Sequence, residues 1–309
     1  MYNIKSVYLI GLGAIGGAIA GRILEYFPEC LKIVVDRERS ERYGKAGIKI
    51  NGKTVGFDFV HPDEIEDIAD LIIIAVKQHH LTETIKDIKR LVGSGTTILS
   101  LLNGISSEEI IGKEYGIDKM LYSFCVGTDT VRAETAINYT NIGRVVFGDR
   151  TNSQLSLRVN AVRDFFDKAH VPYSIPENII REQWWKFMMN VGINQVSAVL
   201  RSPYGPFMTA GEARDLMFAA SREVISISRE AGITLNEEDI EKYATILDTL
   251  SPLGKTSMLQ DVEAGRKTEV EIFAGTVIKL SVQYGIQTPV NDVLYKIIKA
   301  IEQLGRTVK

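Results

Sequence analysis

An apolar stretch in the second half of the chain, from Trp184 to Gln195, carries a narrow stripe of polar side chains. Lys186, Asn190 and Asn194 are spaced four residues apart, so in a helix they drift by only about 40° per step and share one face. Polar groups among apolar neighbours need partners, because burying one without a hydrogen bond costs about 1 to 3 kcal/mol. The spacing therefore predicts a helix whose polar face meets a partner or a ligand.

A lysine on such a face suits proton transfer. Burial disfavours an ammonium ion and brings the pKa of a lysine toward neutral pH, where it can act as a general acid. We therefore expect Lys186 to give a proton to a developing negative charge. The alternative is that Glu182, one helical turn earlier, pairs with Lys186 at the surface and that the asparagines cap neighbouring loops.

A second group of candidates lies on the segment from Thr256 to Tyr284, which we expect to be one helix. If that helix is continuous, Ser257, Asp261 and Glu269 fall within about 120° of one face. A hydroxyl there can grip a substrate carboxylate, and Glu269 can orient Lys186 or bind a substrate hydroxyl. The alternative is that these acids are solvated, as acids on long helices usually are.

A glycine pattern near the N-terminus predicts a dinucleotide site. The first glycine of Gly-x-Gly-x-x-Gly permits a tight turn, the second admits a pyrophosphate close to the backbone, and the third permits close packing of helix and strand. The anion then lies at the helix N-terminus. The pattern stands between a strand-like run and a helical stretch and consists of Gly11, Leu12, Gly13, Ala14, Ile15 and Gly16.

The residues after the second expected strand bear on the choice of nicotinamide cofactor. Asp36 stands where a carboxylate accepts a hydrogen bond from the ribose 2′-hydroxyl, which favours NAD. Arg37, Arg39 and Arg42 follow, and a guanidinium there can clamp the 2′-phosphate of NADP. The alternative for these arginines is a solvated surface turn.

Lys77 and Asn103 stand at the carboxyl ends of the third and fourth expected strands, the edge where open α/β sheets bind ligands. Either can contact the nicotinamide, its ribose or the substrate. The alternatives are a surface lysine and an ordinary Asn-Gly turn.

Periodicity predicts the fold class, an N-terminal α/β domain with a Rossmann-type, doubly wound sheet and an all-α C-terminal domain. We place the boundary near Pro176, giving a dinucleotide-binding domain of residues 1–176 and a helical substrate or dimerisation domain of residues 177–309. The expected strands are 6–10, 31–35, 70–77 and 96–102, with a hairpin at Asn51-Gly52 in the segment 47–60 and antiparallel strands at a sheet edge within 128–140. The expected helices of the second domain are 178–200, 210–231, 237–250, 256–284 and 291–304.

Composition excludes several classes of protein. With 45% hydrophobic and 24% charged residues the chain reads as globular, and a net charge of −3 without a basic run argues against nucleic acid and membrane partners. The two cysteines, Cys30 and Cys125, show no metal-ligand spacing, and we expect no metal and a reducing compartment. No signal peptide pattern is visible, and the apolar runs are far shorter than the roughly 20 residues of a membrane span, so we expect a cytoplasmic protein.

The whole chain resembles the ketopantoate reductase (2-dehydropantoate 2-reductase) family. The lysine and asparagine spacing also resembles β-hydroxyacid dehydrogenases, whereas the Ser-Met-Leu-Gln-Asp segment and the Thr-Glu pair after it are more specific. The matching pieces are Gly11 to Gly16, Val76-Lys77, Asn103-Gly104, the Lys186, Asn190 and Asn194 helix, Ser257 to Asp261, and Thr268-Glu269.

The resemblance implies an NADP-dependent oxidoreductase that reduces ketopantoate to (R)-pantoate, which feeds pantothenate and coenzyme A biosynthesis. It implies that Lys186 is the general acid, that Glu269 contacts substrate and lysine, and that Asn190, Asn194 and Ser257 line the substrate pocket at an interdomain cleft. A family arginine stands where Arg37 does, which favours NADP over the NAD that Asp36 allows. The helical domain also allows a homodimer.

This sequence departs from the family pattern where substrate-contacting asparagines of some members are replaced by Tyr204 and Gly254, and where Gln195 stands in place of a frequent proline. The reaction type is unaffected, but the identity of the keto acid is left open. The alternatives are a related reductase of another small branched keto or hydroxy acid, and a non-catalytic NADP-binding sensor.

Overall fold

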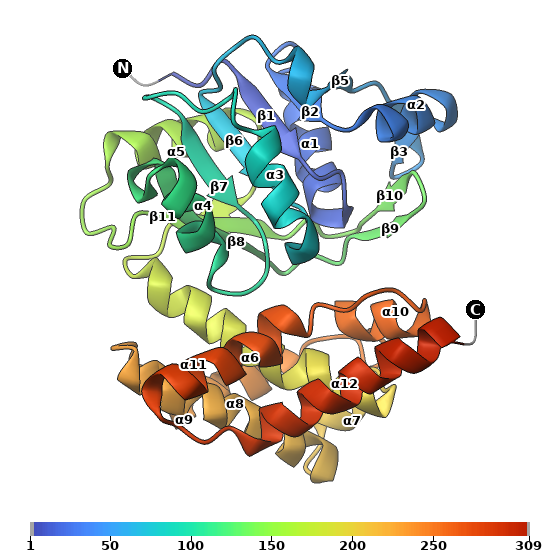
Figure 1. Cartoon of the computed structure of the whole chain (residues 1–309), viewed down its shortest axis with the longest axis vertical. Coiled ribbons are helices and arrows are strands. Elements are labelled where there is room, and N and C mark those ends of the chain that lie inside the picture. The colour runs from blue at the N-terminus through green and yellow to red at the C-terminus, as the bar shows by residue number, and fades with distance from the viewer. Residues whose placement is uncertain (1–2, 308–309) are drawn as a thin grey trace. The chain divides into compact units, whose positions relative to one another are not determined.

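The computed structural model describes residues 3–307, with side chains as far as residue 305. The chain forms two compact units, 1–179 and 180–309, which we call the α/β unit and the helical unit. Figure 1 shows a sheet flanked by helices in the first and helices alone in the second. The predicted fold class is therefore confirmed.

The α/β unit is built on an eight-stranded sheet in the order β12-β11-β8-β7-β6-β1-β2-β5. Neighbouring strands are parallel except β8 and β11, which are antiparallel. Strands β1, β6 and β7 are buried at every position, as strands covered on both faces must be. The strands are β1 Val7–Ile10, β2 Leu31–Val34, β5 Asp58–Val60, β6 Leu71–Ile74, β7 Thr97–Ser100, β8 Met120–Val126, β11 Arg144–Gly148 and β12 Tyr173–Ser174.

Helices pack on both faces of this sheet because successive side chains of a strand point to opposite sides. Val7 and Leu9 of β1 belong to the core that includes residues of α1 and α5, whereas Tyr8 and Ile10 belong to the core that includes residues of α3 and α4. The helices are α1 Ala14–Tyr26, α3 Leu81–Asp87, α4 Ser107–Tyr115 and α5 Leu157–Lys168. This is the doubly wound arrangement that was predicted.

The strand order reverses between β1 and β6. From β1 the chain adds β2 and β5 on one side, and it then returns to add β6, β7 and β8 on the other. In open α/β sheets a ligand crevice forms at the carboxyl ends of the strands at such a reversal. The glycine loop follows β1 at this point.

A separate four-stranded sheet, in the order β4-β3-β10-β9, corrects the prediction of edge strands on the main sheet. The predicted hairpin is present, with φ of 46° at Asn51 and 81° at Gly52. A Cβ on Gly17 or Gly21 of α1 would lie 2.1 Å from Ile137 or 2.4 Å from Ile50, so these two glycines make room for the small sheet. Its strands are β3 Ile48–Ile50, β4 Lys53–Val55, β9 Val131–Ala133 and β10 Ala136–Asn138.

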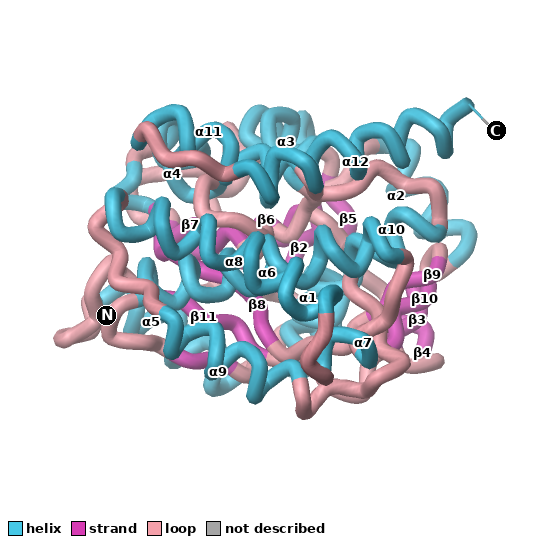
Figure 2. The backbone as a smooth tube through the Cα atoms, turned by 90° about the horizontal axis from the view of Figure 1, so that it is seen from below, coloured by secondary structure: helices cyan, strands magenta, loops and turns pink. Residues whose placement is uncertain are grey.

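All strands that the structure describes lie in the α/β unit, and the helical unit consists of helices and loops (Figure 2). Its long helix α6 is apolar around most of its surface and is buried along most of its length. Between residues 3 and 307, no helix has the length and hydropathy that a membrane crossing requires. The elements are α6 Ile179–Leu200, α7 Gly205–Met208, α8 Glu212–Glu230, α9 Glu237–Leu247, α10 Ser257–Glu263, the π-helix η4 Glu271–Gly275, α11 Thr276–Tyr284 and α12 Pro289–Thr307.

The prediction of one helix from Thr256 to Tyr284 is wrong. Helix α10 ends after Glu263, because Gly265 adopts a φ of +63°. The Gly265 N–H donates to the carbonyl of Val262, and the Arg266 N–H donates to the carbonyl of Asp261. These two bonds close the helix in a Schellman arrangement. Helix then resumes only at η4.

We predict that Gly16→Ala destabilises the protein by about 1 to 3 kcal/mol, because its Cβ would lie 2.0 Å from the Gly11 carbonyl oxygen and 2.9 Å from the Cβ of Ala75. The matched control is Gly44→Ala in the helix α2 Arg37–Ala46, where a Cβ meets nothing within 4 Å. There alanine should stabilise by about 0.5 to 1 kcal/mol. Thermal and urea unfolding measure both variants, and equal stability for the two would contradict the packing argument.

Candidate functional site

The loop after β1 passes too close to the end of β6 for side chains at two of its glycines. Gly11 has a φ of +101°, and a Cβ there would lie 2.5 Å from the carbonyl oxygen of Ala75 and 2.9 Å from Val76. At Gly16 a Cβ would overlap the Gly11 carbonyl. Protein packing alone therefore requires glycine at both positions.

Gly13 has a different explanation. A Cβ there would meet no protein atom closer than 3.9 Å, so packing within the chain does not require glycine. Gly13 is the N-cap of α1, no side chain caps this end of the helix, and its first turn contains no acidic residue. Backbone N–H groups and the helix dipole thus face an open space that suits an anion. The residues Gly11 to Gly16 fit a dinucleotide pyrophosphate.

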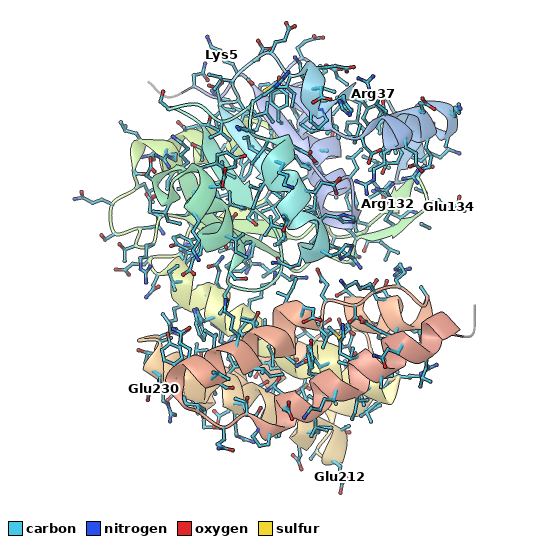
Figure 3. The ribbon with its side chains drawn as sticks, viewed as in Figure 1. Lys5, Arg37, Arg132, Glu134, Glu212 and Glu230 are labelled. Atoms are coloured by element: carbon cyan, nitrogen blue, oxygen red, sulfur yellow. The ribbon has the colours of Figure 1, made fainter. Side chains whose placement is uncertain are left out.

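Asp36 caps the next helix. Its carboxylate accepts from the backbone N–H of Arg39 at 2.6 Å, and the Arg39 guanidinium lies 3.4 Å from it. Arg37 pairs with Glu64 at 3.2 Å, and both side chains are largely exposed, as Figure 3 shows for Arg37. Arg37 to Ala46 form the helix α2 and not a turn, but Arg37, Arg39 and Arg42 are solvent-exposed, as the alternative expected. The negative charge of Asp36 is already partly balanced by Arg39.

Lys77 and Asn103 occupy the sheet edge that was predicted for them. Lys77 follows β6 as the N-cap of the short helix η2, Gln78–His80, and Asn103 follows β7 in the loop before α4. Both are half-buried. Since β1, β6 and β7 run parallel, their carboxyl ends and the glycine loop share one edge.

A buried polar network that the sequence analysis missed fixes the Asn103 loop. The Ser100 hydroxyl donates to Ser107 at 2.8 Å, and Ser107 donates to the Glu108 carboxylate at 2.9 Å. Glu108, only 1% exposed, also accepts from the N–H of Ser123 at 3.2 Å. The network ties both ends of the loop to β8, so the loop that carries Asn103 has little freedom. The sequence signal that could have indicated this network is Glu108, an acidic residue in the apolar pattern after Asn103-Gly104.

In the helical unit, the predicted substrate residues Asn190, Asn194 and Ser257 meet. The Asn194 amide donates to the Asn190 side-chain oxygen at 3.2 Å. The Asn194 oxygen accepts from the Ser257 hydroxyl at 3.3 Å and from the Met258 N–H at 3.5 Å. Asn194 is 6% exposed, whereas Ser257 is exposed, so this cluster reaches the surface. Asn194 therefore contacts the N-terminal end of the neighbouring helix α10. Lys186 lies two turns before Asn194 on α6.

The start of α10 is fixed to α6 by a second contact. The Thr256 hydroxyl caps α10 by accepting from the N–H of Leu259 at 3.1 Å, and it shares a hydrogen bond of 2.5 Å with the buried Ser197 hydroxyl. Ser197 is three residues after Asn194 on α6. These bonds fix the register in which Ser257 meets Asn194.

Ser257 and Asp261 are one turn apart on α10 and share a face as predicted, whereas Glu269 lies outside that helix, contrary to prediction. Asp261 is buried and pairs with Arg266 at 2.9 Å. Glu269 is half-buried in the turn between α10 and η4, and its carbonyl accepts from the N–H groups of Ile272 and Phe273. Its pairing with Lys186 stays a prediction. A π-helix directly after it is notable, because π-turns occur frequently at functional sites.

Two of the three departures from the family pattern, Tyr204 and Gly254, contact each other. The N–H of Tyr204 donates to the carbonyl of Gly254 at 2.9 Å, and a Cβ on Gly254 would lie 2.9 Å from the tyrosine ring. The ring therefore occupies the space that a side chain at residue 254 would need. Burial raises the pKa of the Tyr204 hydroxyl. The position of the Tyr204 ring therefore requires a residue without a side chain at position 254.

The fold and the site together define a two-unit protein with a dinucleotide-type glycine loop in one unit and an asparagine and serine cluster in the other. In the described part of the chain, no group of three or more His, Cys, Asp or Glu is placed to hold a metal ion. The chain belongs to the ketopantoate reductase family of oxidoreductases. Residues 7–152 match "Ketopantoate reductase PanE/ApbA" and residues 178–302 match "Ketopantoate reductase PanE/ApbA C terminal".

Its similarity to individual members is low in sequence and high in structure. A 2-dehydropantoate 2-reductase of Aquifex aeolicus is 26% identical over 304 residues, which cover 95% of this chain and 96% of that protein. A dimeric ketopantoate reductase from Staphylococcus aureus superposes with a TM-score of 0.82 at 20% identity, covering 97% and 99% of the two chains. D-mandelate dehydrogenase with NADH and anilino(oxo)acetate superposes with a TM-score of 0.86 at 22% identity, with the same coverage.

We predict that Asn194→Ala lowers the free energy of unfolding by about 1 to 3 kcal/mol, because it removes buried hydrogen bonds to Asn190, Ser257 and Met258. Ser257→Ala should change stability by no more than about 0.5 kcal/mol, because the serine is exposed. Urea unfolding tests both variants. If Ser257→Ala were the more damaging of the two, Asn194 would not be the centre of the cluster.

Proposed function

We propose that this chain is an NADPH-dependent reductase that converts ketopantoate to (R)-pantoate, the step that feeds pantothenate and coenzyme A biosynthesis. One observation carries the proposal: the same chain holds a glycine loop with an uncapped helix N-terminus at a sheet reversal and, one turn after Lys186 on α6, the start of a polar cluster. Membership of the ketopantoate reductase family and the similarity to the Aquifex aeolicus enzyme support it.

In the proposed mechanism, the reduced nicotinamide, when bound, supplies the hydride that the 2-keto carbon accepts. Gly11 to Gly16 hold the pyrophosphate, and Lys77 and Asn103 orient the nicotinamide end or the substrate. The ammonium of Lys186 gives its proton to the keto oxygen as negative charge develops there, and Glu269 orients that ammonium. Asn190, Asn194 and Ser257 bind the carboxylate and hydroxyl of the keto acid.

For the cofactor, we favour NADPH and assign its 2′-phosphate to Arg37 and Arg39. The carboxylate of Asp36 is engaged by the N-terminus of α2 and by Arg39, which weakens its repulsion of a phosphate. Arg37 pairs with the exposed Glu64, and a doubly charged phosphate competes well for a guanidinium. NADH is the alternative that Asp36 leaves available.

We predict that Arg37→Ala raises the KM for NADPH about tenfold, the equivalent of about 1.4 kcal/mol, and changes the KM for NADH little. Glu64→Gln should act in the opposite direction and lower the KM for NADPH, because it frees Arg37 from its ion pair. Steady-state kinetics with both reduced cofactors measures these changes. Parallel shifts for NADPH and NADH would place the 2′-phosphate elsewhere.

A second candidate substrate is another small branched or ring-bearing 2-keto acid. Tyr204 packed over Gly254 puts an aromatic ring where some members present amide groups. The structurally similar D-mandelate dehydrogenase is recorded with anilino(oxo)acetate, a ligand that carries an aromatic ring.

A panel of keto acids with NADPH and NADH separates these candidates. The proposal expects the highest kcat/KM for ketopantoate with NADPH. A higher value for another keto acid would favour the second candidate. Tight NADPH binding with no oxidation by any keto acid would favour a non-catalytic sensor.

We predict that Lys186→Ala lowers kcat by about 10²- to 10⁴-fold, because the nascent alkoxide loses its proton donor. Cofactor affinity should change little, since Lys186 lies outside the α/β unit that carries the glycine loop. Lys279→Ala on the exposed side of α11 is the control and should keep full activity. Near-normal turnover of the Lys186→Ala enzyme, measured as cofactor oxidation, would reject the assignment.

We also propose a homodimer formed through the helical unit. Helix α12 exposes three apolar side chains on one side, Val293, Ile297 and Leu304, which are 54%, 39% and 67% exposed. The similar Staphylococcus aureus reductase is dimeric, which supports the proposal. Light scattering of the purified chain tests it, and a monomer at micromolar concentration would contradict it.

A further inference from the structure

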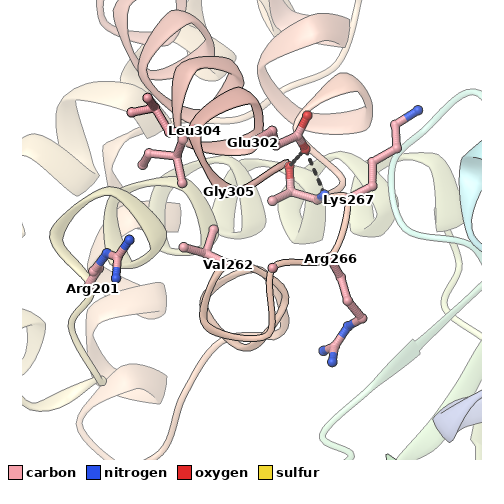
Figure 4. A pocket seen from close by; sticks show the side chains of 10 residues that line it. Arg201, Val262, Arg266, Lys267, Glu302, Leu304 and Gly305 are labelled. Atoms are coloured by element: carbon pink, nitrogen blue, oxygen red, sulfur yellow. Dashed lines mark hydrogen bonds between the residues drawn. The ribbon is translucent and has the colours of Figure 1, made fainter. Parts of the chain in front are cut away.

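Glu302 on α12 binds the residue directly before Glu269. Its Oε1 atom accepts two hydrogen bonds from Thr268, one from the backbone N–H at 2.8 Å and one from the hydroxyl at 2.7 Å (Figure 4). The Glu302 side chain is 6% exposed, and Thr268 is 3% exposed. A buried carboxylate with two donors from one residue fixes the backbone of that residue.

The charge of Glu302 is itself stabilised. Burial opposes it, but the two bonds from Thr268 and the charge of Lys299 outweigh burial and lower the pKa of the Glu302 carboxyl. The Lys299 ammonium lies 3.3 Å from the second carboxylate oxygen, Oε2. At neutral pH Glu302 is therefore an acceptor for both Thr268 donors.

The same face of α12 also holds the residue that begins the π-helix. Lys299 lies 2.9 Å from the carboxylate of Glu271, and the Tyr295 hydroxyl donates to that carboxylate at 2.9 Å. Tyr295, Lys299 and Glu302 are spaced four and three residues apart, which places them on one helical face. We call them the α12 clasp. The clasp binds Thr268, one residue before Glu269, and Glu271, two residues after it.

Packing and local bonds hold the later part of this segment, where Val270, Ile272 and Phe273 are buried and the Glu269 carbonyl accepts from two backbone N–H groups. The Schellman turn ends α10, and the following residues Arg266 and Lys267 are exposed. A pocket of about 260 Å³ lies beside Thr268 and Glu302, lined also by Val262, so packing is incomplete on that side. The next regular α-helix is α11, beyond η4. Beside the pocket, hydrogen bonds to α12 therefore supply a positioning of Thr268 that close packing does not.

We propose that Glu302 is a positioning residue of the reductase: through Thr268 it sets the place of Glu269, and Glu269 in turn orients Lys186. This inference rests on the proposed function for the roles of Glu269 and Lys186. Glu302 touches neither substrate nor cofactor in this scheme. A displacement of about 1 Å at an orienting group can lower a rate by up to about 10²-fold, so a remote clasp can matter for turnover.

The kinetic experiment compares Glu302→Ala, Glu302→Gln and the control Asp292→Ala, an acid on the same helix that pairs with Lys296. Glu302→Ala should lower kcat about 10- to 100-fold at unchanged NADPH affinity. Glu302→Gln keeps an oxygen acceptor for Thr268 and should stay within about threefold of wild type, as should Asp292→Ala. Equal loss in the glutamine and alanine variants would overturn the proposal.

A double-mutant cycle shows whether Glu302 acts through Glu269. In a Glu269→Gln background, Glu302→Ala should cause little further loss of kcat, because the group that it positions is already disabled. If Glu302→Ala lowers kcat by the same factor in both backgrounds, its effect is a general structural one and the proposal fails.

Amide hydrogen exchange of residues 264–275 in the full chain gives a readout without substrate. Glu302→Ala should speed exchange there by at least about tenfold, while Glu302→Gln and Asp292→Ala should not. Unchanged exchange in Glu302→Ala overturns the clasp whatever the substrate is. Wild-type protein that reduces no keto acid overturns the proposed function, and the exchange result still decides whether Glu302 holds the segment.

Discussion

The cofactor site depends on one close backbone contact. The loop after β1 passes against the carbonyl of Ala75 at a distance that leaves no room for a Cβ at Gly11, and Gly16 packs on Gly11 in the same way. This contact brings the N-terminus of α1 to the point where the strand order reverses. It also places the ends of β6 and β7, with Lys77 and Asn103, on the same edge of the sheet. Gly13 has no packing reason of this kind, and we propose that a bound dinucleotide pyrophosphate is the reason for glycine there.

In the helical unit the candidate functional residues come from separate elements, so contacts between these elements must position them. Asn194 joins α6 to the start of α10, and the Thr256–Ser197 hydrogen bond fixes the register. Glu269 lies between a Schellman turn and a π-helix, and its carbonyl accepts the first backbone hydrogen bonds of the next helical run. Side chains of α12 add hydrogen bonds to the residues on either side of it. Polar side-chain contacts therefore position groups that regular secondary structure does not.

The sequence was sufficient wherever the determining signal is local. The glycine pattern, the buried strands and the shared face of Asn190 and Asn194 follow from spacing alone, and the structure contains each of them. The break in the segment from Thr256 to Tyr284 was missed, because a single Gly265 is tolerated in many helices and its positive φ is set by the capping bonds. The strands within 128–140 were assigned to a sheet edge and not to the small sheet, because alternation does not specify the partner strand.

Glu108 and Glu302 were missed because their partners are distant in the chain, 15 and 34 residues away. Sequence patterns also leave the pairing of Lys186 with Glu269 as a prediction. The most direct test of the whole account is a single turnover with NADPH carrying deuterium at the transferring C4 position, mixed with ketopantoate. The account predicts pantoate with one deuterium at C2 for each cofactor oxidised. Cofactor that is bound but never oxidised, or pantoate formed without the label, would contradict it.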